Sequence, residues 1–251
     1  MSANDTAAAP SPAEAPTIAA VLAGGTGARM GADVPKQLLD VGGKPVLRHT
    51  LEAFEAAPQI DLIVVVMAEG YADAVRAMAA DAGVTKLAGV IAGGATRSDS
   101  SRAAVAWAQA RLAPGEDCRL LLHDAARMLV SGRIIADVAA ALDRHGAVGV
   151  AVASTDTVIE VRSEGGETFV AAVPDRASLR RVQTPQGFRL SVIRAAYAAA
   201  DADPDFRATD DCSVVLRYLP HVPVRVVDGE ERNLKVTEPS DLVVAEALLE
   251  R

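Results

Sequence analysis

Short aliphatic runs alternate with amphipathic stretches along most of the chain, and this alternation constrains the fold more than any other feature. The runs that we expect to be strands are 18–22, 62–67, 87–91, 120–123, 147–152 and 222–227. Helices are expected at 46–56, 71–80, 99–112, after Ser131, at 190–200, after Thr209 and from Glu238 onward. Strand–helix alternation favours a parallel sheet, and nearly continuous apolar strands are typical of sheets buried on both faces. We therefore expect an α/β fold with a mostly parallel twisted sheet flanked by helices.

One segment departs from this alternation. Two short apolar runs, 158–161 and 168–173, flank the turn Ser163-Glu-Gly-Gly166. Two such runs around a glycine-rich turn indicate a β-hairpin. We expect an antiparallel arm inserted at about 155–175.

The rest of the chain is consistent with one domain. With 251 residues, half of them apolar, the chain can bury a full core, and we expect a single domain over 17–251. Residues 1–16 are rich in Ala, Pro and Ser and lack the charged and apolar regions of a signal peptide. We expect them to form a disordered tail.

Composition also limits the partners. The net charge is -8, and no Lys/Arg run with interleaved aromatics is present, so a nucleic-acid partner is not expected. The sequence contains no run of about 18 apolar residues, so no membrane span is predicted. Cys118 and Cys212 lie far apart without metal-ligand spacing, so we expect reduced structural thiols and a cytoplasmic location.

A glycine loop follows the first predicted strand. It reads Leu22-Ala-Gly-Gly-Thr-Gly-Ala-Arg-Met30 and is followed by Pro35-Lys36. At the carboxyl end of a strand, such glycines let backbone amides approach phosphates, although some dinucleotide-binding dehydrogenases have similar spacing. The cations Arg29 and Lys36 favour a triphosphate site, because they can neutralise charge that develops during displacement at the α-phosphorus.

A second cluster, His123-Asp124-Ala-Ala-Arg127, ends another predicted strand at the same sheet edge. A carboxylate at Asp124 could bind ribose hydroxyls or Mg²⁺. The structural alternative is that Asp124 caps the following turn, Arg127 is a solvated charge and His123 is structural.

Further polar segments follow other predicted strands. In Gly93-Gly-Ala-Thr-Arg-Ser-Asp-Ser100, either Ser98 or Asp99 could cap a helix, and Ser100 could face a nucleotide. Late in the chain, 183–186, 209–211 and 233–237 are polar islands, and Lys235 could bring another cation to a phosphate.

Taken in this order, these segments resemble the 2-C-methyl-D-erythritol 4-phosphate cytidylyltransferase family from about Ile18 to Leu249. The motifs that carry the resemblance are LAGGTGARM with PKQ, GGATRSDS, LLHDAAR, STDT, Asp175-Arg176, VQTPQGF, TDD and NLKVTEPSDL. The resemblance implies a Rossmann-like nucleotidyltransferase fold. It also implies transfer of a cytidylyl group from CTP to methylerythritol phosphate by in-line attack, with Mg²⁺ or another divalent cation on the triphosphate.

The resemblance assigns roles to individual residues. The catalytic group is Arg29, Lys36, Arg176 and Lys235. The nucleotide-binding group is Ala23, Gly24, Gly25, Thr26, Gly27, Gly94, Ser100 and Asp124. The acceptor-binding group is Asp124, Arg127, Thr157, Arg176, Thr184, Thr209 and Lys235. The metal is expected on the CTP phosphates, and Asp124 is the candidate protein ligand.

In this family the hairpin arm grips a second subunit, which implies a homodimer. Thr157 and Arg176 would then contribute to the neighbour's active site. Two departures from the family pattern bear on substrate fit. Met128 stands where proline is frequent, and Ile159-Glu160 stands where a lysine is usual.

Three alternatives remain from the sequence. A ribitol 5-phosphate cytidylyltransferase would share fold and loop, but Ala125-Ala126 favours methylerythritol phosphate. A nucleotide-binding regulatory module could keep the fold without turnover, although the retained cations of the site argue against it. A dehydrogenase would use a carboxylate after the second strand, which Glu69 could supply, but it leaves Pro35-Lys36-Gln37 without a role.

Overall fold

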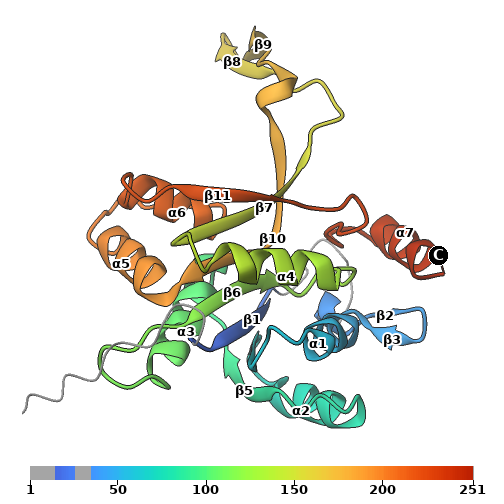
Figure 1. Cartoon of the computed structure of the whole chain (residues 1–251). Coiled ribbons are helices and arrows are strands. Elements are labelled where there is room, and N and C mark those ends of the chain that lie inside the picture. The colour runs from blue at the N-terminus through green and yellow to red at the C-terminus, as the bar shows by residue number, and fades with distance from the viewer. Residues whose placement is uncertain (1–14, 26–34, 251) are drawn as a thin grey trace, which may run out of the picture.

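The computed structural model describes residues 15–25 and 35–250, and Figure 1 shows a central sheet with helices on both faces. The strands of the main sheet are β1 (Thr17–Ala23), β4 (Leu62–Met67), β5 (Leu87–Ala92), β6 (Arg119–Asp124), β7 (Ala147–Ala153), β10 (Arg180–Arg189) and β11 (Val224–Asp228). The helices are α1 (Val46–Ala56), α2 (Ala72–Asp81), α3 (Arg97–Gln109), α4 (Gly132–Ala141), α5 (Leu190–Ala200), α6 (Asp211–Tyr218) and α7 (Pro239–Leu249). Smaller elements are the 3-10 turns η2 (Lys36–Leu38) and η3 (Arg176–Ser178) and the hairpins β2 (Asp40–Val41) with β3 (Lys44–Pro45) and β8 (Glu160–Glu164) with β9 (Glu167–Ala172).

The seven strands lie in the order β11-β7-β10-β6-β1-β4-β5, and only β10 runs antiparallel to its neighbours. The predicted α/β fold with a mostly parallel sheet is confirmed. Leu22 of β1 lies opposite Asp124 of β6 and Val66 of β4. The glycine loop and the Asp124 segment therefore leave the sheet side by side.

Alternate residues of each central strand face opposite layers. Ile18, Ala20 and Leu22 of β1 pack in one cluster with residues of α3, α5 and α6. The residues between them, Ala19 and Val21, pack in another cluster with residues of α1, α2 and α4. Because both faces are covered, the strands carry apolar residues throughout, which is the pattern seen in the sequence.

Strand β10 is the main element that the sequence pattern did not predict. Its sequence, RRVQTPQGFR, carries charges and a proline instead of a continuous apolar run. Its pairing with β7 shifts between Gln183 and Gly187, and Pro185 lies in this irregularity. A proline cannot donate to a ladder, so a bulge is where a central strand can accommodate it.

The predicted arm is present. In Figure 1 the hairpin β8–β9 projects away from the body of the molecule. Gly165 and Gly166 form its turn with positive φ angles of 61° and 84°, a conformation that glycine adopts without steric cost. Every residue of both strands is exposed.

Two helix starts differ from the predictions. Thr96, not Ser98 or Asp99, caps α3, and Asp99 completes a capping box from the third helical position. Asp210, one residue after Thr209, caps α6 through its side chain. Ser131 caps α4 as predicted. In both corrected cases several adjacent residues can accept the same backbone hydrogen bond, so the sequence leaves the register open.

The last helix rests on a separate small cluster. Met128 is buried there with Val236 of the preceding segment and Ala245 of α7. The family departure at Met128 therefore packs beneath the segment that carries Lys235.

The amino-terminal end of the described chain is packed into the fold. Ala15 is buried and the carbonyl of Pro16 accepts from the amide of Arg119, so these two residues belong to the folded part and not to the expected tail. Residues 1–14 lie outside the described residues.

Within the described ranges, no helix has the length and apolar character needed to cross a membrane.

We expect Phe188→Ala to lower the free energy of unfolding by about 3 to 5 kcal/mol, because this fully buried side chain of β10 joins the core beside α5. Leu216→Ala, at an exposed position of α6, should change it by less than about 0.5 kcal/mol. Urea unfolding of both variants measures the difference. Equal losses would contradict the assigned burial of β10.

Candidate functional site

Two adjoining cavities lie at the carboxyl edge of the central strands. The first, of about 180 Å³, is lined by residues of the glycine loop, η2 and the start of α3. The second, of about 310 Å³, is lined by residues of β10 and the segment before α6. Both are lined by Arg97, Asp124 and Lys235, so these side chains form the boundary between the two cavities.

Closely approaching backbones form one wall of the first cavity. A Cβ added to Gly24 would lie 3.0 Å from Ser100 Oγ, and one added to Gly93 would lie 3.3 Å from the Cα of Gly24. Ser100 Oγ accepts from the amide of Gly94 and donates to the carbonyl of Thr96. The loops after β1 and β5 therefore meet around one hydroxyl. Gly24, Gly25, Gly94 and Ser100, which the resemblance assigns to nucleotide binding, all line the cavity.

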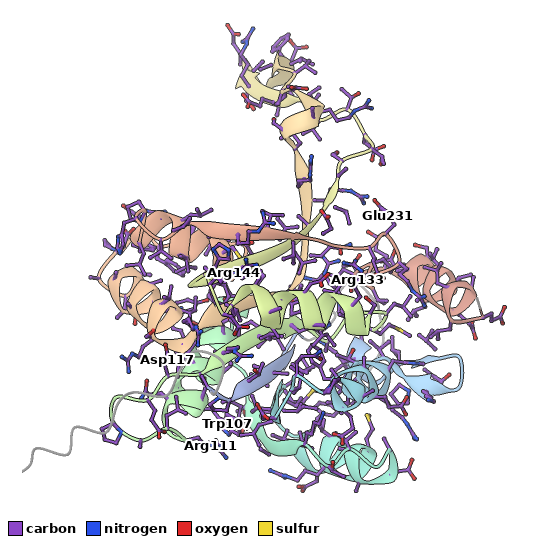
Figure 2. The ribbon with its side chains drawn as sticks, viewed as in Figure 1. Trp107, Arg111, Asp117, Arg133, Arg144 and Glu231 are labelled. Carbon is purple, nitrogen blue, oxygen red and sulfur yellow. The ribbon has the colours of Figure 1, made fainter. Side chains whose placement is uncertain are left out.

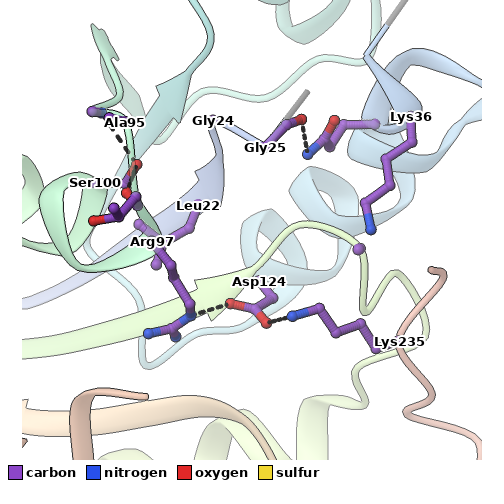
Figure 3. A pocket seen from close by; sticks show the side chains of 13 residues that line it. Leu22, Gly24, Gly25, Lys36, Ala95, Arg97, Ser100, Asp124 and Lys235 are labelled. Carbon is purple, nitrogen blue, oxygen red and sulfur yellow. Dashed lines mark hydrogen bonds and ion pairs between the residues drawn. The ribbon is translucent and has the colours of Figure 1, made fainter. Parts of the chain in front are cut away.

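Lys36 lies on the opposite wall (Figure 3), where its Nζ donates to the carbonyl of Val236 at 2.7 Å. The amide of Val236 in turn donates to the carbonyl of Ala126. These contacts bring Lys36 and Lys235, nearly two hundred residues apart, to one cavity. Gln37, which sequence reasoning left without a role, donates to the carbonyl of Gly25 at 3.2 Å and so supports the glycine loop.

Asp124 ends β6 and is 8% exposed. Its Oδ1 accepts from Arg97 Nε at 2.9 Å, and its Oδ2 accepts from Lys235 Nζ at 2.7 Å (Figure 3). Burial alone would raise the pKa of Asp124, but the charges of Arg97 and Lys235 and their hydrogen bonds outweigh it and hold that pKa well below its usual range. The carboxylate is therefore ionised and carries two cationic partners.

Arg97 is the main site residue that sequence reasoning missed. Its Nη1 donates to Asp211 Oδ2 at 2.7 Å, and Tyr197 Oη donates to Asp211 Oδ1 at 2.6 Å. Burial lowers the pKa of Arg97, but the charges of Asp211 and Asp124 outweigh it and raise that pKa above its usual value. The only sequence signal was its place inside GGATRSDS, because an arginine in the first turn of a helix is otherwise unremarkable.

The second cavity is lined by Arg127, Thr184 and Thr209 of the predicted acceptor group. The guanidinium of Arg127 donates to the carbonyls of Asn233 and Val182. Arg127 therefore joins the Lys235 segment to β10 as well as lining the cavity.

His123 is fully buried and links Thr184 to the Arg127 backbone. Thr184 Oγ1 accepts from the amide of Asp124 at 3.1 Å and lies 3.1 Å from His123 Nδ1, while His123 Nε2 lies 3.2 Å from the carbonyl of Arg127. The carbonyl can only accept, so Nε2 carries the proton, and the Thr184 hydroxyl donates to Nδ1. Burial lowers the pKa of His123 to about 4, which favours this neutral tautomer.

Some predicted residues lie elsewhere. Thr157 and Arg176 are exposed beside the arm, and neither lines the two cavities. Arg176 donates to the carbonyl of Thr155. The side chain of Ala23 is buried in the core, and its neighbours Leu22 and Gly24 line the cavity instead. Thr26, Gly27 and Arg29 lie outside the described residues.

The metal-binding potential of the site follows from its donors. In residues 15–25 and 35–250, no group of three or more His, Cys, Asp or Glu side chains could hold a metal ion. Asp124 is the carboxylate that both cavities share, and Arg97 and Lys235 already occupy its oxygens. A cation carried by phosphates fits this donor set better than one held by a cage of side chains.

Figure 2 places other charged side chains, including Arg133, Arg144 and Glu231, on the outer surface. Arg133 and Arg144 line an open groove of about 420 Å³ between α4 and β11. Arg133 there pairs with Asp137 and Glu230. This groove is separate from the shared boundary at Asp124.

Known proteins resemble the chain in sequence and fold. A sequence profile of the 2-C-methyl-D-erythritol 4-phosphate cytidylyltransferase family matches residues 17–251. The protein of that name from Thermobifida fusca is 56% identical over 232 residues, which cover 92% of each chain. A bifunctional ribulose 5-phosphate reductase/CDP-ribitol pyrophosphorylase from Haemophilus influenzae is 36% identical over 93% of this chain and 48% of its own.

Solved structures agree with this relationship. The 4-diphosphocytidyl-2C-methyl-D-erythritol synthase of Anaerococcus prevotii superposes with a TM-score of 0.80 at 28% identity, covering 94% of this chain and 97% of that one. The 2-C-methyl-D-erythritol 4-phosphate cytidylyltransferase of Thermus thermophilus gives a TM-score of 0.70 at 31% identity, covering 95% and 100%.

The neutral state of His123 predicts a specific pH dependence. An unfolded histidine titrates near pH 6.5, so the stability that the neutral imidazole contributes is complete above about pH 6.5 and is lost as the pH falls toward about 4. In this window His123→Gln should flatten the fall in unfolding free energy by up to about 1.4 kcal/mol per pH unit. Urea unfolding across the window tests this, and parallel curves for variant and wild type would contradict it.

Proposed function

This chain belongs to the 2-C-methyl-D-erythritol 4-phosphate cytidylyltransferase family, and from that premise we propose how its residues divide the reaction. The chain transfers the cytidylyl group of CTP to 2-C-methyl-D-erythritol 4-phosphate, giving 4-diphosphocytidyl-2-C-methyl-D-erythritol and pyrophosphate. The observation that supports our assignment is the pair of cavities that adjoin at Asp124. A displacement between two substrates needs two binding sites that meet where the bond forms.

We assign CTP to the first cavity. Gly24, Gly25 and Gly94 leave room for close backbone contacts, and Ser100 lies between their loops. We assign Asp124 to the ribose. The family resemblance adds Ala23, Thr26 and Gly27 to this nucleotide-binding group.

We assign the acceptor to the second cavity. Thr184 and Thr209 offer hydroxyls, and Arg127 and Lys235 offer positive charge. Lys235 lies at the boundary, where the acceptor's phosphate must reach the α-phosphorus of CTP.

In the reaction, an oxygen of the acceptor's phosphate attacks the α-phosphorus of CTP. The bond from the α-phosphorus to the bridging oxygen breaks, and pyrophosphate leaves with that electron pair. Lys36 and Arg29 stabilise the charge that accumulates on the phosphates. The attacking oxygen is already anionic, so no side chain needs to remove a proton. Mg²⁺ or another divalent cation would be held mainly by the triphosphate, with Asp124 as the candidate protein ligand, and would supply further charge neutralisation.

We propose a homodimer formed through the arm. The segment around the arm exposes large apolar side chains, among them Val161, Val170 and Val173, at 56%, 59% and 62%. Such a concentration favours a protein partner. A second chain would cover these side chains and would receive Thr157 and Arg176 beside its acceptor cavity.

We place the enzyme in the cytoplasm. Cys118 and Cys212 are both free and buried, and free thiols persist in a reducing compartment.

A pyrophosphate-release assay tests the reaction and the role of Lys36. With CTP and methylerythritol phosphate, Lys36→Ala should lower turnover roughly a hundredfold or more, because one preorganised charge contact is lost. Chelation of divalent cations should abolish turnover in the wild type. Unchanged pyrophosphate release by the variant would refute the role of Lys36, and parallel reactions with ribitol 5-phosphate and without acceptor would expose a different acceptor or hydrolysis.

Complementation between subunits tests the shared site. Alone, Arg176→Ala chains and Lys36→Ala chains should each be nearly inactive. After random exchange, half of the dimers are mixed and one site in each is intact, so about a quarter of wild-type activity should return. No recovery despite demonstrated exchange would place Arg176 outside the neighbour's site.

A further inference from the structure

The contact between Lys235 and Asp124 poses a problem for acceptor binding. If Lys235 binds the acceptor's phosphate, its Nζ must turn away from Asp124 Oδ2, which it now contacts at 2.7 Å. Asp124 is buried, and a buried carboxylate that loses its partner pays a large desolvation penalty. The exchange therefore requires something else to keep Asp124 compensated.

Arg97 meets that requirement because it is fixed from a second side. Its Nε contacts Asp124 while its Nη1 contacts Asp211, whose side chain is completely buried. Asp211 is held in turn by the hydroxyl of Tyr197, and its amide donates to Gln186. Arg97 cannot leave Asp124 freely without disturbing this second carboxylate.

Lys235 is held less firmly than Arg97. Its side chain is 39% exposed, compared with 25% for Arg97. Among the described residues, its Nζ contacts Asp124, which it reaches from the opposite side to Arg97 (Figure 3). The two partners of Asp124 are therefore held differently. Arg97 is anchored between two carboxylates, whereas Lys235 is more exposed and contacts one.

We propose that Arg97 is a positioning residue that keeps Asp124 neutralised, so that Lys235 can exchange Asp124 for the acceptor's phosphate. The inference rests on the proposed role of Lys235 in binding that phosphate. Arg97 acts through Asp124 and Lys235 and need not touch the acceptor. Without Arg97, Asp124 competes with the phosphate for Lys235, and acceptor binding weakens while the nucleotide contacts of the glycine loop remain.

Steady-state kinetics of Arg97→Met test this competition. At saturating CTP, the KM for methylerythritol phosphate should rise about tenfold or more, the scale of one charge-assisted contact, and the KM for CTP should change less than about threefold. Arg102→Met is the matched control, because Arg102 lies on the same helix, is 26% exposed and pairs with Asp201 without touching Asp124. Its acceptor KM should stay near the wild-type value.

The double variant Arg97→Met/Asp124→Asn gives the sharpest result. If Arg97 works by neutralising Asp124, its loss should matter little once that charge is gone, so at saturating CTP the double variant should have nearly the same acceptor KM as Asp124→Asn alone. A rise in acceptor KM from Asp124→Asn to the double variant as large as the rise from wild type to Arg97→Met would overturn the proposal, as would an equal rise of both KM values in Arg97→Met.

Two further variants protect the interpretation. Arg97→Met leaves Asp211 buried without its cation, so Arg97→Met/Asp211→Asn removes that charge and should fold while keeping the raised acceptor KM. A wild-type acceptor KM in this folded variant would overturn the proposal. Lys235→Met separately tests the premise: if its acceptor KM is unchanged, the proposed role of Lys235 fails, whatever the Arg97 variants show.

Discussion

Asp124 is a buried carboxylate at the end of a central strand, and the site around it is organised by the need to compensate its charge. Arg97 arrives from the first turn of α3 and Lys235 from the segment before α7. Each of these segments is anchored by further contacts: Asp211 holds Arg97, and the backbone of Val236 joins Ala126 and Lys36. A single charge at the strand end thereby gathers cations from distant parts of the sequence.

The backbone of Asp124 is held as firmly as its side chain. Its amide donates to Thr184, whose hydroxyl is oriented by the neutral imidazole of His123, and His123 packs against the ring of Phe54 with centroids 5.0 Å apart. Placing an uncharged imidazole here avoids a further cation in the interior. A protonated His123 would also lose the acceptor at Nδ1 that fixes the Thr184 hydroxyl. The end of β6 is therefore held through both the backbone and the side chain of Asp124.

The sequence predicted the features that follow from hydrophobic periodicity and from the positions of the strand ends. Parallel strands place their carboxyl ends at one edge, so the convergence of Gly24, Gly94 and Asp124 could be expected from the alternation of strands and helices. Strand β10 could not be predicted from the sequence, because its sequence lacks an apolar run and its position is set by backbone pairing with β6 and β7. Arg97 was missed for a related reason: its importance comes from Asp211, 114 residues away, and no local pattern joins the two.

The antiparallel insertion of β10 also explains how one chain can build a second cavity beside the first. A purely parallel sheet gathers loops at its carboxyl edge only from βα connections. Because β10 runs the opposite way between β6 and β7, its early residues Gln183 and Thr184 lie beside the end of β6, and its beginning leads directly from the arm. The strand that lines the second cavity is thus the covalent continuation of the projecting hairpin. The arm and the second cavity are therefore joined by one continuous strand, β10, and the backbone pairing of that strand with β6 and β7 fixes both to the sheet.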